Sequence, residues 1–173
     1  MKETFIHPTA VIYPNVMIGE GVYIGPFCVI GAPPEHTRYN GAGFGVHIGD
    51  GVIMDKAVVV DSGVEGKTCI GSNSRIMSGV HVGHDAIIFG GCILSPKCCI
   101  GGHSVIRPEA NIGMGALIHQ NVTIPSRCMI GMGAVVSKAA ALKMEPAQTY
   151  VGNPARWIGP NKKWAVHSPD LNQ

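Results

Sequence analysis

Aliphatic side chains recur at every sixth position along most of this chain. Three runs carry the repeat: Ile6, Ile12, Ile18, Ile24 and Ile30; then Ile48, Met54 and Val60; then Ile70, Ile76, Val82, Ile88, Leu94, Ile100, Ile106, Ile112, Ile118, Ile124, Ile130 and Val136. Glycine often follows the aliphatic residue directly, as in Gly19, Gly25 and Gly71. A six-residue period of this kind indicates a parallel β-helix, in which each coil buries the apolar edge of its neighbour.

A second inward position stands four residues after each aliphatic one. Its occupants are small: Ala10, Val16, Val22, Cys28, Val52, Val58, Ser74, Val80, Ala86, Cys92, Cys98, Ser104, Ala110, Ala116, Val122, Cys128 and Ala134. Three hexads make one triangular coil of 18 residues. Four of the six cysteines occupy this small slot, so we expect them to be core residues rather than reactive groups.

Two segments interrupt the repeat, and a third follows it. Residues 31–47 place polar or small residues where aliphatics are due, and residues 61–69 add four residues to the count. We predict a β-helix over residues 1–136 with excursion loops at 31–47 and 61–69. Residues 137–173 are expected to form a short helix and a tail that caps the open end of the core. Long excursions from a rigid scaffold are where binding groups are often mounted.

Composition narrows the class of protein. A chain of 173 residues is large enough for one domain with a real core, and a formal net charge of +2 predicts no strong field toward nucleic acid. The N-terminus has no apolar signal-peptide region, and no run approaches the 18 apolar residues of a membrane span. The cysteines include no C-x-x-C pair. We therefore expect a cytoplasmic protein without disulfides or a zinc–thiolate site.

Polar residues converge on one strip of the predicted solenoid. The stretch "SGVHVGHDAIIFGG" (78–91) holds His81, His84 and Asp85, and the repeat runs without insertion from Ile70 to Val136. Residues 18 apart should therefore stack about 4.8 Å apart. The stacked columns are His84, Gly102 and Gln120; Asp85, His103 and Asn121; and Gly83, Gly101 and His119.

Such a strip suits either acid–base or metal chemistry. His84 as a neutral imidazole can take a proton from an attacking hydroxyl or amine, with Asp85 fixing its tautomer and the Gly102 amide receiving the developing oxyanion. The metal alternative is a carbonic anhydrase. Hexapeptide-repeat carbonic anhydrases carry Val-Gly-His with a second zinc-binding histidine five residues later, where this chain has Phe89. A phenyl ring cannot bind zinc, so we expect no metal centre.

The in-register polar set resembles the UDP-N-acetylglucosamine acyltransferase family of lipid A synthesis. The matching segments are "IHPTAV" and "IGPFC" near the N-terminus, "GSNSRIMSGVHVGHD" (71–85), "GGH" (101–103) and "HQ" (119–120). The match covers residues 6 to about 136 and implies a left-handed coil and a homotrimer. It also implies His84 as general base and Gly102 as oxyanion donor. The substrate contacts it implies are His81, His103, His119, Gln120, Arg38, Met77 and Met132, the last at the far end of the acyl chain.

Two departures from that family concern the substrates. Its first excursion carries Gln-Asp-Leu-Lys-Tyr, where this chain has "EHTRY" (35–39), so that Arg38 keeps a cation but the Gln-Asp pair is changed. The sequence is also expected to lack the family's long helical C-terminal domain. In its place "VGNPARWIG" (151–159) is similar to the ending of hexapeptide acetyltransferases that use coenzyme A.

These observations predict an all-β protein, a left-handed parallel β-helix with a short C-terminal capping segment. We expect an acyltransferase that moves an acyl group from a thioester, on acyl carrier protein or coenzyme A, to a hydroxyl or amine of a sugar nucleotide such as UDP-N-acetylglucosamine. No permanently bound cofactor is expected. The alternatives are an acetyl-CoA-dependent sugar acetyltransferase for surface polysaccharide, a non-catalytic hexapeptide-repeat scaffold and a gamma-type carbonic anhydrase. The acceptor, the donor carrier and the acyl length stay open.

Overall fold

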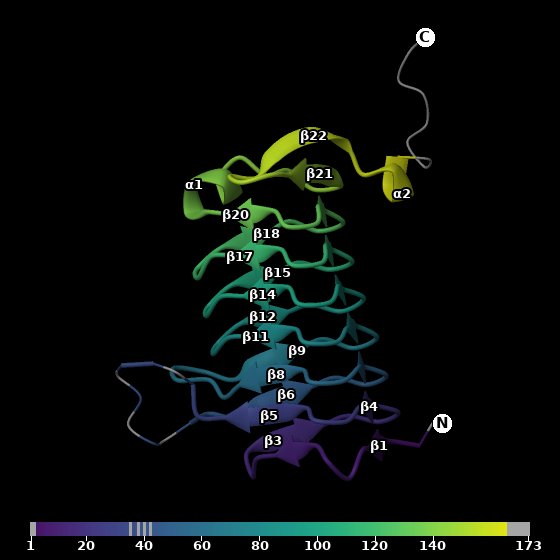
Figure 1. Ribbon diagram of the computed structural model, residues 1–173, viewed down its shortest axis with the longest axis vertical. Coiled ribbons are helices and arrows are strands. Elements are labelled where there is room, and N and C mark those ends of the chain that lie inside the picture. Colours follow the sequence, from purple (N-terminus) through teal and green to yellow (C-terminus); the bar gives the residue numbers. More distant parts are fainter. Residues whose placement is uncertain (1–2, 35, 38, 40, 42, 166–173) are drawn as a thin grey trace.

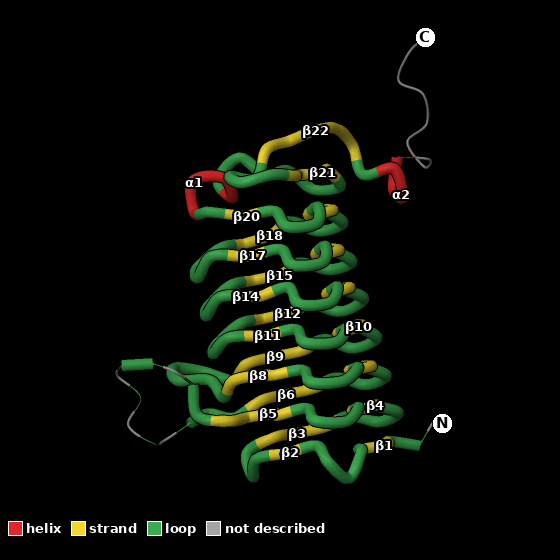
Figure 2. The backbone as a smooth tube through the Cα atoms, viewed as in Figure 1, coloured by secondary structure: helices red, strands yellow, loops and turns green. Residues whose placement is uncertain are grey.

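The computed structural model describes residues 3–34, 36–37, 39, 41 and 43–165, and shows a solenoid of stacked coils (Figures 1 and 2). The chain rises from β1 at one end to the C-terminal elements at the other. Each full coil contributes one short strand to each of three parallel sheets. The fold is the predicted left-handed parallel β-helix.

The strands of the described chain form three sheets. From β1 to β20, consecutive strands belong to the first, second and third sheet in turn. The first sheet contains β1 (Phe5–Ile6), β4 (Tyr23–Ile24), β7 (Ile53–Met54), β10 (Arg75–Ile76), β13 (Ile93–Leu94), β16 (Asn111–Ile112), β19 (Met129–Ile130), β21 (Gln148–Val151) and β22 (Arg156–Pro160). The second contains β2 (Val11–Ile12), β5 (Val29–Ala32), β8 (Val59–Asp61), β11 (His81–Val82), β14 (Cys99–Ile100), β17 (Leu117–Ile118) and β20 (Val135–Val136). The third contains β3 (Val16–Ile18), β6 (Val46–Ile48), β9 (Thr68–Ile70), β12 (Ile87–Ile88), β15 (Val105–Ile106) and β18 (Thr123–Ile124).

The register follows the sequence repeat. His81 lies opposite Cys99, and Cys99 lies opposite Leu117, so residues 18 apart stack directly. The aliphatic and small slots from Val22 to Val136 supply nearly all of the buried core, including the four cysteines Cys28, Cys92, Cys98 and Cys128. Burial raises the pKa of Cys92 to about 11 and that of Cys98 to about 12, so these thiols stay protonated near neutral pH.

The first coil departs from the pattern of burial. Ile6 keeps 39% of its surface exposed, and Ile12 and Ile18 are only partly buried. These residues hold the aliphatic slot, but no coil of the described chain stacks beneath them. The repeat predicts which way a side chain points, whereas burial also needs a neighbouring coil.

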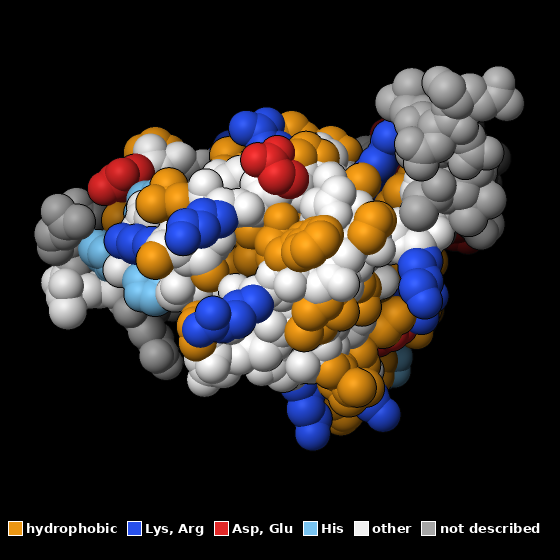
Figure 3. All heavy atoms as spheres, turned by 90° about the horizontal axis from the view of Figure 1, so that it is seen from above, with side chains coloured by type: hydrophobic (Ala, Val, Ile, Leu, Met, Phe, Trp, Pro, Cys, Tyr) orange, Lys and Arg blue, Asp and Glu red, His pale blue; other side chains and the backbone are white. Residues whose placement is uncertain are grey.

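The C-terminal elements close the other end of the solenoid (Figure 2). After helix α1 (Lys138–Ala141), β21 pairs in parallel with β19, and β22 turns back antiparallel to β21. Buried Met144, Tyr150 and Ala155 cover the last coil. Helix α2 (Lys162–Ala165) places Trp164 under the Arg127 guanidinium, 4.6 Å from the ring centroid. Seen end-on, this face combines hydrophobic side chains with Lys and Arg around them (Figure 3).

Candidate active site

The polar strip lies at the corner where the second sheet turns into the third. Strands β11, β14 and β17 stack in register, so the turns that follow them stack as well. In successive turns one column contains His84, Gly102 and Gln120, and the next contains Asp85, His103 and Asn121. Asp85, His103 and Asn121 all have φ between 58° and 59°, a left-handed conformation in which Asp, Asn and His are enriched.

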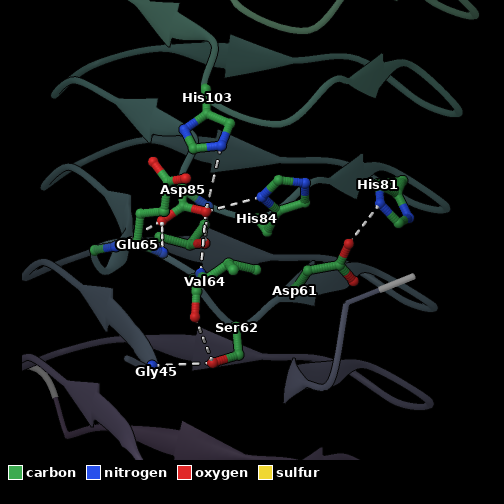
Figure 4. Close-up of polar contacts among 12 residues, drawn as sticks. Gly45, Asp61, Ser62, Val64, Glu65, His81, His84, Asp85 and His103 are labelled. Carbon is green, nitrogen blue, oxygen red and sulfur yellow. Dashed lines mark hydrogen bonds and ion pairs between the residues drawn. The ribbon is translucent and has the colours of Figure 1, made fainter. Parts of the chain in front are cut away.

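Asp85 is the centre of the polar contacts at this corner (Figure 4). Its carboxylate lies 2.8 Å from His84 Nδ1 and accepts the backbone N–H of Val64, Glu65 and Gly66 at 3.0, 2.9 and 2.7 Å. The side chain is only 6% exposed. One carboxylate therefore holds the second excursion loop and orients an imidazole at the same time.

The protonation of this pair follows from its surroundings. Burial by itself would raise the pKa of Asp85, but hydrogen bonds from His84 and from the N–H groups of Val64, Glu65 and Gly66 outweigh it and lower the pKa below its ordinary value. The carboxylate is therefore ionised at neutral pH and can only accept hydrogen bonds. His84 must donate from Nδ1, which leaves the lone pair of a neutral imidazole on Nε2.

Acid is expected to remove the stability that the ionised Asp85 carboxylate contributes to the fold. Because the folded pKa of Asp85 lies below the unfolded value of about 3.9, its contribution to stability is complete above that value and disappears as pH falls through the folded pKa. Urea titrations from neutral pH to about pH 3 should show the loss in wild type. Asp85→Asn should cost about 1–3 kcal/mol at neutral pH, because its amide group cannot accept every N–H that the carboxylate accepts. A mutant with the same stability and the same acid slope as wild type would contradict the assignment.

Gly102 leaves space for the imidazole of His84, which lies on the preceding coil. A Cβ added at Gly102 would lie 2.7 Å from His84 Nε2 and 2.8 Å from Cε1, closer than real Cβ atoms approach other atoms. Gly102 is buried, and it lies in the same column as His84 and Gln120. Nε2 of His84 therefore lies directly against the Gly102 backbone.

Two further imidazoles pack around His84. The rings of His84 and His103 are perpendicular with centroids 5.0 Å apart, and His36 from the first excursion packs edge-on at 4.8 Å. A pocket of about 280 Å³ opens here, lined by His36, Glu65, His84, His103, Gln120 and Asn121. Hydrogen bonds join the two excursion loops to each other. The Gly45 N–H donates to the Ser62 hydroxyl, and the Phe44 N–H donates to the Gly63 carbonyl.

His81 lies outside that pocket and has its own carboxylate. Its Nε2 is 3.2 Å from Oδ2 of Asp61, at the end of β8 (Figure 4). His119, which the sequence places beside Gln120, is exposed and donates from Nδ1 to the Gln120 carbonyl at 3.0 Å. The structure thus brings Gln120 to the pocket with His84, while His119 is exposed and is not among the residues that line it.

Two other expected substrate contacts lie away from His84 within one chain. Met77 follows β10 and Met132 follows β19, so both lie at the corner between the first and second sheets rather than beside His84. Met132 is 73% exposed. Arg38 falls outside the described residues.

The sequence suggests no role for four residues that the structure places at or near the strip. His36, Glu65 and Asn121 line the pocket, and Asp61 pairs with His81. The periodicity does place Asn121 in the column of Asp85 and His103. The other three lie in or beside the excursions, where the hexad count does not predict position.

Three ligand atoms gather closely enough to hold a metal ion. They belong to His84, Asp85 and His103, and all lie within 4.8 Å of one another.

Among the described residues, no helix is long and apolar enough to cross a membrane.

Comparison with known proteins agrees with this fold. The family model for bacterial transferase hexapeptide (six repeats) matches residues 1–32. The chain is 31% identical to a UDP-N-acetylglucosamine acyltransferase from Bacteroides fragilis, with a TM-score of 0.87, covering 92% of this chain and 62% of that one. A further crystal structure of a UDP-N-acetylglucosamine acyltransferase is 30% identical with a TM-score of 0.75, covering 91% of this chain and 72% of that one. The chain belongs to the hexapeptide-repeat acyltransferase family.

Within this family the curated relatives are longer proteins. The acyl-(acyl-carrier-protein)–UDP-N-acetylglucosamine O-acyltransferase of Brucella ovis is 31% identical, and the match covers 51% of this chain and 46% of the relative. The chain thus spans about half the length of the curated hexapeptide-repeat acyltransferase that it matches.

Proposed function

We propose that this chain transfers an acyl group from a thioester to a hydroxyl or amine of a sugar nucleotide such as UDP-N-acetylglucosamine. The observation that carries the proposal is the His84–Asp85 pair, which leaves His84 Nε2 as a proton acceptor at the pocket and against Gly102. Family membership supports the reaction class, and the geometry supports the roles of the residues.

The proposed reaction is direct attack without an acyl-enzyme. His84 Nε2 takes the proton of the acceptor hydroxyl or amine, and the oxygen or nitrogen of the acceptor attacks the thioester carbonyl carbon. The oxyanion of the tetrahedral intermediate is stabilised by the Gly102 N–H, and the carbon–sulfur bond then breaks. The departing thiolate takes the proton back from the His84 imidazolium, which Asp85 stabilises in the meantime. No permanently bound cofactor takes part in this reaction.

The acceptor is proposed to enter the pocket at its sugar end. The volume of about 280 Å³ is at the lower limit of small-molecule sites, so only part of a sugar nucleotide fits within one chain. His103, Gln120 and Asn121 supply polar contacts for sugar hydroxyls. We propose that a neighbouring subunit of a homotrimer completes the cleft, in the cytoplasm where both thioester carriers are made available.

The two candidate functions differ in the carrier of the acyl group, which is acyl carrier protein in the first and coenzyme A in the second. A second cavity of about 550 Å³ lies at the C-terminal end and is lined by Lys143, Arg156 and Trp157 beside Tyr150 and Pro154. Two cations and an exposed indole suit the phosphates and adenine of coenzyme A. This cavity favours the second candidate, an acetyl-CoA-dependent sugar acetyltransferase, whereas the match to the acyl-carrier-protein-dependent relative favours the first.

Acyl length is expected to depend on Met132. If the acyl chain runs between subunits to that corner, a methionine fills space that glycine would leave to several methylenes, each worth about 0.8 kcal/mol when buried. Wild type should therefore prefer short or medium chains, and Met132→Gly should prefer longer ones. A series of acyl donors compared by kcat/KM measures the shift. An unchanged preference in the mutant would mean that the chain ends elsewhere.

A panel of two carriers and two acceptor types tests the function. Acyl carrier protein and coenzyme A thioesters of matched length should be offered with UDP-N-acetylglucosamine and with its amino-sugar counterpart. One pairing should release free thiol at a rate that depends on the acceptor. If every thioester stays intact with every acceptor, the chain is a non-catalytic scaffold and the proposal is wrong.

A further inference from the structure

Beside the pocket, one possible metal-ligand atom from each of His84, Asp85 and His103 lies within 4.8 Å of the other two. Asp85 Oδ2 is 2.8 Å from His84 Nδ1 and 3.7 Å from His103 Nε2. The ligand atoms of a tetrahedral zinc site, at about 2.0–2.1 Å from the ion, are about 3.4 Å apart. A zinc ion therefore fits among these atoms after shifts on the order of 1 Å.

The surroundings favour binding rather than mere proximity. Two imidazoles and one carboxylate are borderline ligands of the kind that zinc prefers. The carboxylate is held in place by three backbone N–H groups of the second excursion, which is how outer contacts orient a metal ligand. The pocket beside the three atoms leaves room for a water or an incoming ligand as the fourth partner.

We propose that His84, Asp85 and His103 form a zinc site that switches the general base off. In the metal-free chain His84 carries its proton on Nδ1, donates it to Asp85 and keeps the lone pair on Nε2. Zinc bound at Nδ1 replaces the proton on that nitrogen, so a neutral imidazole must carry its proton on Nε2 instead. The nitrogen that faces Gly102 then becomes a donor and can no longer accept the proton of an acceptor hydroxyl.

Zinc binding and inhibition by zinc can be measured separately. The site itself depends only on the three side chains, whereas the inhibition rests on the proposed function. From the sequence we expect no metal centre, because Phe89 replaces the second histidine of the carbonic anhydrase spacing. The ligands here come instead from two coils 18 residues apart, with Asp85 next to His84 in sequence.

Titration calorimetry with zinc sulfate in a non-chelating buffer tests the binding. Wild type is expected to bind one zinc ion per chain. His103→Asn and His84→Ala should weaken that binding by about tenfold or more, and the exposed His119→Ala should leave it unchanged. Circular dichroism and melting curves for each variant check that it is folded. If wild type shows no such site, or if the ligand variants bind as wild type does, the proposal is wrong.

Transfer assays test the switch. Zinc should inhibit wild type at the concentration at which it binds, a chelator should restore the rate, and His103→Asn should need about ten times more zinc. Full activity with the site occupied would overturn the switch. Absence of transfer in metal-free protein would count against the proposed function, and the calorimetry would still decide the site.

Discussion

Replacing His84 with alanine is expected to lower kcat/KM for acyl transfer by about 10²–10⁴-fold, the usual contribution of a general base. The fold should survive, because His84 lies at an outer corner and the aliphatic core does not depend on it. Steady-state kinetics at saturating donor measure the first effect, and melting curves with size-exclusion chromatography measure the second.

His119→Ala is the matched control for this substitution. It removes an imidazole from the same strip, two coils along and one column away, without touching Asp85. Its chemical step should be much less affected than that of His84→Ala. A His84→Ala protein that keeps more than about a third of wild-type activity would remove His84 from the mechanism.

The second large effect is expected from a single methyl group at Gly102. In Gly102→Ala the new Cβ would lie 2.7 Å from His84 Nε2, so the imidazole must move. A displacement of about 1 Å at a catalytic group can cost on the order of 10²-fold in rate. The backbone itself should tolerate alanine, since His84 and Gln120 occupy the equivalent turn position on neighbouring coils. The loss should appear in kcat, with a modest change in melting temperature.

Gly90→Ala separates a site effect from a turn effect. Gly90 holds the equivalent turn position at another corner, where its Cβ would lie 3.1 Å from the Ser72 carbonyl and far from any imidazole of the strip. It should lose stability to a similar degree and keep the chemical rate of wild type. If Gly90→Ala and Gly102→Ala lose activity equally, the contact between Gly102 and His84 is not what matters.

The hexad repeat made the fold predictable to the level of register. A constant offset of 18 residues places His81 opposite Cys99 and sets His84 one coil before Gly102 in the same column, because identical coils leave no freedom in the stacking. The same arithmetic put Asp85 beside His103, which lies 3.7 Å from the carboxylate. Positions within the uninterrupted repeat could therefore be read from the sequence alone.

The excursions could not be read in this way. His36 reaches the ring of His84 through a loop whose path depends on tertiary contacts such as Gly45 N–H to Ser62. The three N–H donors to Asp85 come from residues 64–66, which follow no repeat. Burial at the open end was also unpredictable from pattern, as exposed Ile6 shows. The roles of Met77 and Met132 depend on a neighbouring subunit and stay predictions.

Direct acyl transfer from a thioester to a sugar nucleotide is tested most directly by mass spectrometry. The products are analysed after wild-type protein is incubated with an acyl thioester and a sugar nucleotide. We expect a sugar nucleotide heavier by one acyl group less a hydrogen, an equal amount of free carrier thiol, and no acyl group left on the protein. An unmodified sugar nucleotide with intact thioester across the donor and acceptor panel, or an acylated protein as the end product, would contradict this expectation.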